Sequence, residues 1–232
     1  MRYIALATDY DGTLAHDGEV DAETIGALER LLQSGRKLIM VTGRELPDLE
    51  SVFSRFSLFD RIVAENGAVI YTPATGEKQV LAEPPVPAFV ETLRRRGIDP
   101  LSFGDVIVAT RRPHETAVLE VIRDLGLELN VVFNKGSVMI LPASVNKMSG
   151  LKVALESLGI AADHTVGVGD AENDHAFLKC CGFSVAVANA LASLKETADL
   201  TTHADHGAGV VELIDMILAD DPRLRKGYTA PA

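Results

Sequence analysis

Aspartates follow two short apolar runs of this sequence, residues 3–7 and 165–168, within a few positions of the end of each run. Apolar runs of this length without alternation predict buried parallel strands, and ligands bind such sheets at the carboxyl ends of the strands. We therefore expect four carboxylates to converge at one edge of a sheet, those of Asp9, Asp11, Asp170 and Asp174.

Four carboxylates in so small a space cannot all stay ionised unaided, because like charges at short range disfavour one another. A divalent cation resolves this conflict, and a set of oxygen ligands suits Mg²⁺. Two further groups are expected nearby: the hydroxyl of Thr42, after the apolar run 38–41, and Lys147, near the start of a predicted helix. Mg²⁺, a lysine, a hydroxyl and exposed backbone amides together make a site that holds a phosphoryl group.

The elements that must position these groups form a doubly wound α/β pattern. Buried strands are expected at residues 3–7, 38–41, 61–64, 165–168 and 183–187. Helices are expected at residues 21–34, 46–56, 146–158, 172–181 and 209–218, and the tail 220–232 is expected to be poorly ordered. Few strand positions alternate between apolar and polar, which indicates parallel pairing with both faces covered.

The middle of the chain follows a different pattern. Residues 83–87 are proline-rich and read as a linker. The expected elements beyond the linker are helices at 89–96 and 114–125 and strands at 106–110, 129–133 and 138–141. We therefore predict a small α+β domain, residues 83–143, inserted into a core made of residues 1–82 and 144–232.

The composition restricts the partners. The chain has 232 residues and a net charge of −11, which argues against nucleic acid or an anionic membrane as a partner. No run approaches 18 apolar residues, and the N-terminus turns acidic too soon for a signal peptide. The two cysteines, Cys180 and Cys181, are adjacent and are expected to be reduced. These features predict a cytoplasmic protein, either a monomer or a homodimer.

The acidic and basic groups occur in the order of a known family. The segment Asp9-Tyr10-Asp11-Gly12-Thr13, then Thr42, Lys147 and the segment Gly169 to Asp174, resemble the four motifs of the haloacid dehalogenase superfamily. The predicted insert lies where a C2-type cap domain belongs in that family. The resemblance extends over residues 3–218 and is greatest to the Cof-like phosphatases, which include sucrose-phosphate, mannosyl-3-phosphoglycerate and archaeal phosphoglycolate phosphatases.

The resemblance implies a role for each core residue. Asp9 is then the nucleophile that forms an aspartyl-phosphate, and Asp11 is the acid and base for the leaving alkoxide and the hydrolytic water. Thr42 and Gly43 would bind the phosphoryl group, and Lys147 would neutralise its charge. Mg²⁺ would be held by Asp9, the main-chain carbonyl of Asp11, Asp170 and, directly or through water, Asp174, while Asn173 orients the set.

Some assignments are less specific. Arg112 and Lys135, in the predicted insert, are candidate substrate contacts because they supply local positive charge on an acidic protein. Arg44 fits either a substrate contact or an ion pair. Asn66, in Glu65-Asn66-Gly67, is typical of a turn and fits a place in the pocket wall.

The implied activity is Mg²⁺-dependent hydrolysis of a small phosphorylated metabolite, such as a sugar phosphate or a phosphoglycolate-like acid. A phosphomutase of the phosphomannomutase type is the main alternative, since it combines this core with a C2-type cap. A phospho-accepting signalling module would place the acceptor aspartate on a later strand and would have no insert. A dehalogenase would not require the second aspartate, Asp11.

Overall fold

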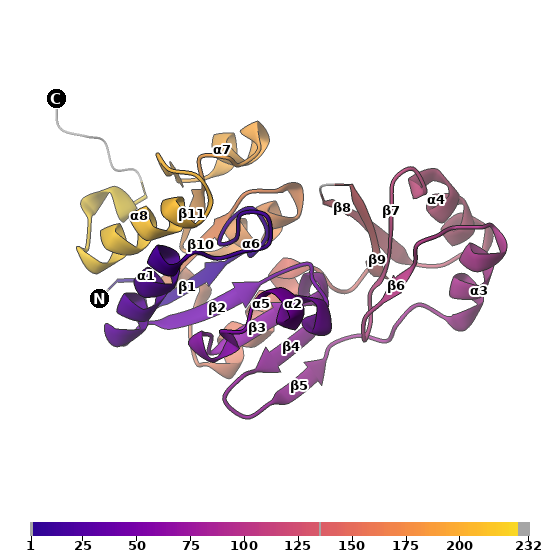
Figure 1. Cartoon of the computed structure of the whole chain (residues 1–232), viewed down its shortest axis with the longest axis horizontal. Helices are drawn as coiled ribbons and strands as arrows, with labels where there is room; N and C mark the ends of the chain where they lie inside the picture. The colour runs from indigo at the N-terminus through magenta and orange to yellow at the C-terminus, as the bar shows by residue number, and fades with distance from the viewer. Residues whose placement is uncertain (1, 135, 227–232) are drawn as a thin grey trace.

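The computed structural model describes residues 2–134 and 136–226, which form two sheets (Figure 1). The larger sheet has eight strands in the order β12-β11-β10-β1-β2-β3-β4-β5. The strands from β12 to β3 pair in parallel, and β4 and β5 form an antiparallel hairpin at one edge. Their bounds are β1 (Ala5–Thr8), β2 (Lys37–Val41), β3 (Arg61–Ala64), β4 (Val69–Thr72), β5 (Glu77–Val80), β10 (Thr165–Gly169), β11 (Phe183–Ala186) and β12 (Leu200–Thr201).

Helices flank this sheet, α1 packing against α8 and α5 against α6. Their bounds are α1 (Ala22–Gln33), α2 (Leu46–Val52), α5 (Lys147–Ser157), α6 (His175–Cys180), α7 (Ala192–Thr197) and α8 (His206–Leu218). The doubly wound core with a separate small α+β part confirms the predicted fold class. None of the helices in the described part of the chain is both long and apolar enough to cross a bilayer.

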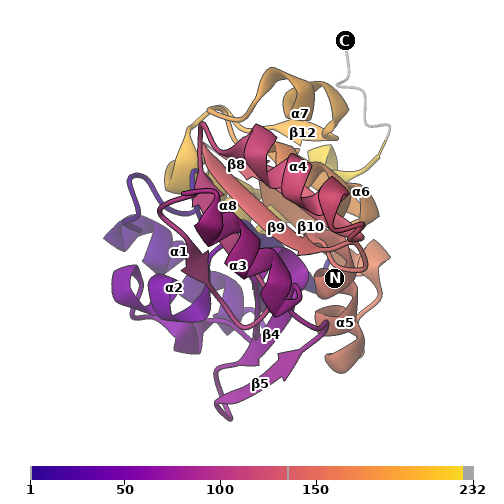
Figure 2. The same cartoon turned by 90° about the vertical axis from the view of Figure 1, so that its right-hand side faces the viewer.

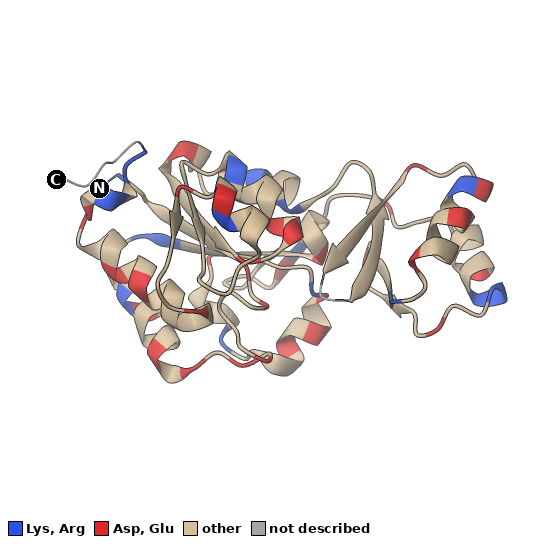
Figure 3. Cartoon of the chain, turned by 90° about the horizontal axis from the view of Figure 1, so that it is seen from above, with Lys and Arg blue, Asp and Glu red and all other residues tan. Residues whose placement is uncertain are grey.

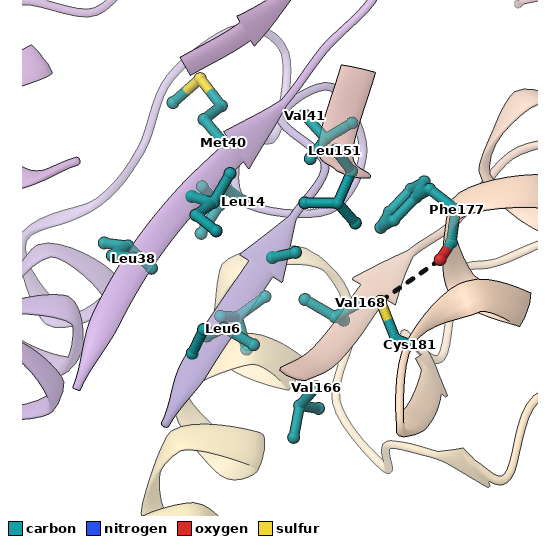
Figure 4. Packing of buried hydrophobic residues seen from close by; sticks show 14 of the residues in the cluster. Leu6, Leu14, Leu38, Met40, Val41, Leu151, Val166, Val168, Phe177 and Cys181 are labelled. Carbon is teal, nitrogen blue, oxygen red and sulfur yellow. Dashed lines mark hydrogen bonds between the residues drawn. The ribbon is translucent and has the colours of Figure 1, made fainter. Parts of the chain in front are cut away.

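The central strands are buried because both of their faces pack against helices. All four residues of β1 are buried, and Leu6 lies in one apolar cluster with Val166 and Val168 of the neighbouring β10 (Figure 4). Leu151 of α5 and Phe177 of α6 belong to the same cluster. Full burial of an aliphatic or aromatic side chain stabilises the fold by about 1.5–3 kcal/mol, so this cluster is a large part of what holds β1 and β10 together.

Two helices begin at side-chain caps that the sequence provides. The Asp21 carboxylate accepts a hydrogen bond of 2.7 Å from the Thr24 backbone N–H at the start of α1. At the start of α5, the Asn146 side chain accepts from the Ser149 backbone N–H, and the Ser149 hydroxyl accepts from the Asn146 N–H. This reciprocal pair fixes the first turn of α5, which carries Lys147.

A second sheet of four antiparallel strands lies beyond the end of the larger one (Figures 1 and 2). Its order is β6-β7-β9-β8, with bounds β6 (Ser102–Phe103), β7 (Val108–Arg111), β8 (Leu129–Asn134) and β9 (Ser137–Pro142). Helices α3 (Pro87–Arg95) and α4 (Glu115–Asp124) cover one face, where acidic and basic residues are interspersed on their outer surfaces (Figure 3). We call these strands and the two helices the small module; all of it lies between β5 and α5 in the sequence.

Alternation along the strands divides the small module into two apolar faces. Val108, Val138 and Ile140 pack with Phe89 and Leu93 under the helices. The opposite face packs toward the larger sheet, in a cluster of Ala68, Val106, Ile107, Met139, Leu141 and Val145. The second cluster joins the small module to Ala68, the residue just before β4.

Several expected elements differ in the structure. The predicted helix 46–56 ends at Val52, and the predicted helix 172–181 begins as a 3-10 turn, Glu172–Asp174, before α6. Helix α8 begins at His206 rather than at residue 209. The sequence analysis did not predict β4, β5, β6, β12 or α7.

The expectation of a poorly ordered tail is wrong for its first residues. Pro222–Leu224 forms a 3-10 turn, and Leu224 is buried against the large sheet's apolar cluster. The Tyr3 hydroxyl donates a hydrogen bond of 2.9 Å to the Leu224 carbonyl, which ties this turn to the start of the chain. The remainder of the predicted tail, 227–232, lies outside the described residues.

Candidate active site

Three buried carboxylates meet at the carboxyl ends of β1 and β10. Asp9 follows β1, Asp170 follows β10, and Asp174 ends the 3-10 turn after it; each offers an oxygen within 4.8 Å of the others. Asp9 and Asp170 are each 4% exposed, and Asp174 is fully buried. Because β1 and β10 are adjacent parallel strands, their ends bring these residues together, as expected from the sequence.

Lys147 lies between two of these carboxylates. Its Nζ donates hydrogen bonds to Asp9 Oδ1 at 2.6 Å and to Asp174 Oδ1 at 2.5 Å, and its side chain is 1% exposed. Burial acts to lower the pKa of Lys147, but the two carboxylates outweigh it and the pKa is raised. Burial raises the pKa of Asp9 well above its usual range, and Lys147 offsets only part of that effect. Lys147 therefore stays protonated, but its single positive charge does not fully compensate the buried carboxylates around it.

Two glycines allow Lys147 to reach this position. A Cβ on Gly150 would lie 2.5 Å from the Gly67 Cα, and a Cβ on Gly67 would lie 1.9 Å from the Asn146 carbonyl oxygen. Gly67 also has a φ of +103°, a left-handed conformation that favours glycine. The start of α5 can approach the turn after β3 this closely only because both residues lack a side chain.

Hydrogen bonds from the backbone hold the loop after β10. Asp174 Oδ2 accepts from the N–H groups of Asp170 and Ala171, both at 2.9 Å. The Thr13 hydroxyl donates to Asp170 Oδ1 at 3.2 Å. A Cβ on Gly169 would lie 2.7 Å from Asp174 Oδ2, so this loop also depends on a glycine. These contacts hold the Asp170 and Asp174 side chains in position within the loop.

Thr42, Gly43 and Asn173 lie around a shared asparagine, Asn66. Thr42 is fully buried, and its Oγ1 accepts from the Arg44 backbone N–H at 3.1 Å. A Cβ on Gly43 would lie 3.3 Å from Asn66 Nδ2. Asn66 Oδ1 accepts from Asn173 Nδ2 at 2.9 Å, while Asn173 Oδ1 is buried with no hydrogen-bond partner among the described residues.

This donor set fits Mg²⁺. The three buried carboxylates offer hard oxygen ligands of the kind that Mg²⁺ prefers. A cation there would also compensate the buried negative charge that Lys147 alone does not neutralise.

The Asp11 carboxylate is not part of the cluster of Asp9, Asp170 and Asp174 but pairs with Arg44. Both of its oxygens accept from Arg44, Oδ2 from Nε and Oδ1 from Nη2, each at 2.7 Å. Arg44 also donates to Asp48 at 2.7 Å, and the hydrogen bond to Asp11 is the largest cause of a raised pKa at Arg44. Of the four carboxylates expected to converge, three do so, and the fourth forms an ion pair at the edge of the site. Strand β1 ends at Thr8, three residues before Asp11, and the chain turns just after Asp11 at Gly12, with φ +87°.

A cleft of about 570 Å³ lies between the two sheets. Its lining comes from the loop after Asp9, the segment after β2 and the open face of the small module, and includes Asp11, Gly43, Arg44, Arg111, Asn134 and Met139. The structure thus brings Asp11 and Gly43 to the side of the cleft that faces residues of the small module.

Arg111 rather than Arg112 lines this cleft. Arg111 follows Ala109 on the open face of β7. Its guanidinium forms no hydrogen bond or ion pair with any described residue, whereas its backbone carbonyl accepts from the His114 N–H at 3.2 Å. Arg112 lines an adjoining hollow, with its guanidinium 5.9 Å from the ring centre of Phe133. Lys135, the other predicted cap contact, lies outside the described residues. The alternation of buried Val108 and Thr110 was the available signal for Arg111.

Of the two residues that follow β3, the sequence analysis assigned a role to Asn66 but none to Glu65. Glu65 is 1% exposed, and its carboxylate accepts hydrogen bonds from the small module's backbone. Asn66 donates to the sulfur of Met139 in β9 at 3.0 Å, in addition to its contact with Asn173. The asparagine is both a turn residue, at φ +52°, and part of the wall around the site.

The chain is similar to known proteins over most of its length. The chain matches the model of the haloacid dehalogenase-like hydrolases over residues 6–108 and 130–214. It is 35% identical over 219 residues to a phosphoglycolate phosphatase from Methanothermobacter thermautotrophicus, and the match covers 90% of this chain and 96% of that protein. A phosphoglycolate phosphatase from Archaeoglobus fulgidus is 32% identical over 218 residues, covering 92% of this chain and 96% of that protein.

The fold also has relatives among solved structures. A haloacid dehalogenase-like hydrolase from Bacteroides thetaiotaomicron has a TM-score of 0.80 and 22% identity, covering 93% of this chain and 99% of that one. The resemblance found from the four motifs is confirmed, and the family and the relatives indicate a phosphatase that acts on phosphoric monoesters. The chain belongs to the haloacid dehalogenase-like hydrolases.

Proposed function

We propose that this protein is a Mg²⁺-dependent phosphatase that hydrolyses a short phosphorylated carboxylic acid of the phosphoglycolate type through an aspartyl-phosphate. The observation that carries the proposal is the buried contact of Lys147 with Asp9 and Asp174, beside Asp170. The names of the relatives support the choice of substrate, because phosphoglycolate phosphatases match nearly the full length of this chain.

Asp9, Asp170 and Asp174 hold the Mg²⁺ in this proposal, together with the main-chain carbonyl of Asp11. When bound, the ion neutralises charge on the phosphoryl oxygens and on the clustered carboxylates. Asn173 contributes through its unpaired oxygen, which accepts a hydrogen bond from a group held at the site.

The nucleophile is the Asp9 carboxylate, which attacks phosphorus while the bond from phosphorus to the substrate alkoxide breaks. Lys147 stays protonated and balances charge on Asp9 and on the transferred phosphoryl group. The hydroxyl of Thr42 donates to a phosphoryl oxygen, and the N–H of Gly43 faces the same group. Water then cleaves the aspartyl-phosphate, releasing phosphate and restoring Asp9.

Asp11 is the general acid of the first step and the general base of the second. It protonates the leaving alkoxide first and deprotonates the hydrolytic water afterwards. Because both Asp11 oxygens accept from Arg44, its side chain must rotate away from Arg44 to reach the leaving group. Asp11 and Arg44 both line the cleft, so this rotation has room to occur.

Residues 83–143 act as the cap that selects the substrate. Arg111 supports this role because an unpaired guanidinium lining the cleft matches the carboxylate end of a phosphorylated acid. Arg112 and Lys135 stay candidate substrate contacts. A cytoplasmic location and a monomer or homodimer stay predictions from the sequence.

The test is a panel of phosphate esters assayed by phosphate release, with Mg²⁺ and with EDTA. The panel contains 2-phosphoglycolate, several sugar phosphates and p-nitrophenyl phosphate, without any bisphosphate activator. We expect the highest kcat/KM for 2-phosphoglycolate and no turnover in EDTA. A higher value for a sugar phosphate would overturn the substrate, and full activity in EDTA would overturn the metal. A phosphomutase would instead isomerise a sugar phosphate, without net phosphate release, only after a bisphosphate activator is added in a separate run.

A further inference from the structure

Glu65 is a buried carboxylate outside the catalytic cluster. Its Oε1 accepts from the Asp105 backbone N–H at 2.8 Å, and its Oε2 accepts from those of Val106 at 2.9 Å and Ile107 at 2.8 Å. Glu65 follows β3 of the larger sheet, whereas the three donors lie in the loop between β6 and β7 of the small module. These hydrogen bonds therefore join parts of the chain about 40 residues apart in sequence.

The backbone on both sides of this contact, at Glu65 and at Gly104, has a conformation or a lack of side chain that the contact requires. A buried carboxylate is costly unless hydrogen bonds replace its lost hydration, and three convergent amides do so here. Glu65 and Asn66 have φ values of +50° and +52°, conformations that cost energy for residues other than glycine. On the other side, a Cβ on Gly104 would lie 2.3 Å from Glu65 Oε1. A strained turn and a glycine are both needed to bring the carboxylate to the amides.

The anchored loop leads directly into the cleft. Strand β7 begins one residue after Ile107, and its open face carries Ala109 and Arg111, which line the cleft. The residue after Glu65, Asn66, contacts Met139 of β9 on one side and Asn173 of the catalytic loop on the other. The pair Glu65-Asn66 thus connects two strands of the small module to the catalytic centre.

We propose that Glu65 is a positioning residue. By holding the loop before β7, it fixes the position of β7, and of Arg111 on it, relative to the catalytic centre at Asp9. It thereby determines selectivity for substrates that extend into the cleft. Glu65 takes no part in bond making or breaking. The inference rests on the proposed function only for the role of the small module in substrate binding. Weakening the hydrogen bonds between Glu65 and the amides of residues 105–107 should weaken binding of a substrate that Arg111 contacts. It should leave the chemistry at Asp9 unchanged.

The test is Glu65→Gln in the full chain, compared with wild type. A glutamine keeps the shape, but its Nε2 cannot accept a hydrogen bond, so at least one amide loses its partner. The matched control is Lys78→Gln, which breaks the exposed ion pair between Lys78 and Asp105, 2.7 Å long, at the same junction. Gly104→Ala is the second variant, because its methyl group displaces the Glu65 carboxylate from the opposite side.

Two readouts are taken, hydrogen exchange of the amides at 105–107 and steady-state kinetics on 2-phosphoglycolate and p-nitrophenyl phosphate. In Glu65→Gln and Gly104→Ala we expect exchange at these amides to quicken about tenfold or more. We expect KM for 2-phosphoglycolate to rise by a similar factor, with kcat for p-nitrophenyl phosphate within about threefold of wild type. Lys78→Gln should match wild type in both readouts.

Three results would overturn the proposal: unchanged exchange at 105–107, an equal loss of kcat on both esters, or the same effects in Lys78→Gln. Failure of the proposed function is distinguishable from these, because it would show as wild type not hydrolysing 2-phosphoglycolate. In that case the best ester of the panel replaces 2-phosphoglycolate, and the exchange and kinetic comparisons are decided in the same way.

Discussion

Replacing Lys147 by methionine tests how the buried charges of the site balance. At 2.6 Å and an effective dielectric of about 20, the attraction between the Lys147 ammonium and the Asp9 carboxylate amounts to about 6 kcal/mol, and the contact with Asp174 is of similar size. Desolvation of the buried lysine offsets several kcal/mol of this attraction. Because methionine leaves two buried carboxylates without their shared cation, we expect the free energy of unfolding to fall by about 3–5 kcal/mol.

The assay is urea unfolding in EDTA, followed by the same titration in excess Mg²⁺. An ion at a hundredfold excess over its dissociation constant stabilises a folded protein by about 2.7 kcal/mol. We expect Mg²⁺ to stabilise Lys147→Met more than wild type, because the competing ammonium has been removed. Phosphatase activity should be lost even in excess Mg²⁺, since no other lysine or arginine of the described residues forms an ion pair with Asp9.

The control is Lys152→Met on the same helix, where the side chain is exposed and the change should stay within about 0.5 kcal/mol. A loss below about 1 kcal/mol in Lys147→Met would refute the charge-balance argument. Equal stabilisation of the variant and wild type by Mg²⁺ would refute the claim that lysine and the ion share these carboxylates.

Three further changes test other parts of the site. Asp170→Asn should raise the Mg²⁺ concentration for half-maximal activity by at least about tenfold, measured by titrating the ion into EDTA-treated enzyme. Asp11→Asn should lose about 10²- to 10⁴-fold in kcat, more for an alkyl phosphate than for p-nitrophenyl phosphate, with a phosphorylated protein detected by rapid quench and intact mass. No trapped phosphate on the protein would contradict the proposed intermediate. Gly150→Ala should lower the free energy of unfolding by about 1–3 kcal/mol because its methyl group meets backbone, whereas Gly26→Ala, with open space around it, should be neutral or slightly stabilising.

The parallel core was predictable because its strands are buried on both faces. The strands ending at Thr8 and Gly169 carry no charged residue and are buried at every position, so their largely apolar pattern marks both of them. The hairpin at the sheet edge has no such pattern, and all four residues of β5, Glu77–Val80, are exposed. It is held by backbone pairing with β4, which leaves no periodic apolar signal in the sequence.

The end of α2 was misplaced for a different reason. The apolar pattern continues past Val52, but Phe53 is extended, with φ −140°, and its ring packs against those of Tyr10, Phe56 and Phe59. The aromatic cluster draws Phe53 out of the helix, and its members come from several segments. Tertiary packing of this kind overrides a local helical pattern.

The sequence predicted which residues lie at the site better than it predicted which way their side chains point. Asp9, Asp170 and Asp174 could be expected to converge because they follow the ends of neighbouring strands. The orientation of the Asp11 side chain depends on its ion pair with Arg44, which follows another strand. The choice between Arg111 and Arg112 depends on which face of β7 opens to the cleft. Glu65 carried no motif, and only the approach of the small module's loop gives its carboxylate a role.

The strand order has a consequence for synthesis on the ribosome. Strand β1 is central, and its two neighbours differ greatly in when they emerge: β2 follows closely, whereas Ala5 pairs with Thr165 of β10. At about 5–20 residues per second, one edge of β1 waits about 10–30 s for that partner. The small module is contiguous in the chain and can close in the meantime, so the nascent protein carries a finished module beside an apolar half-sheet with an open edge. Such an edge is a surface that chaperones bind and neighbouring chains pair with.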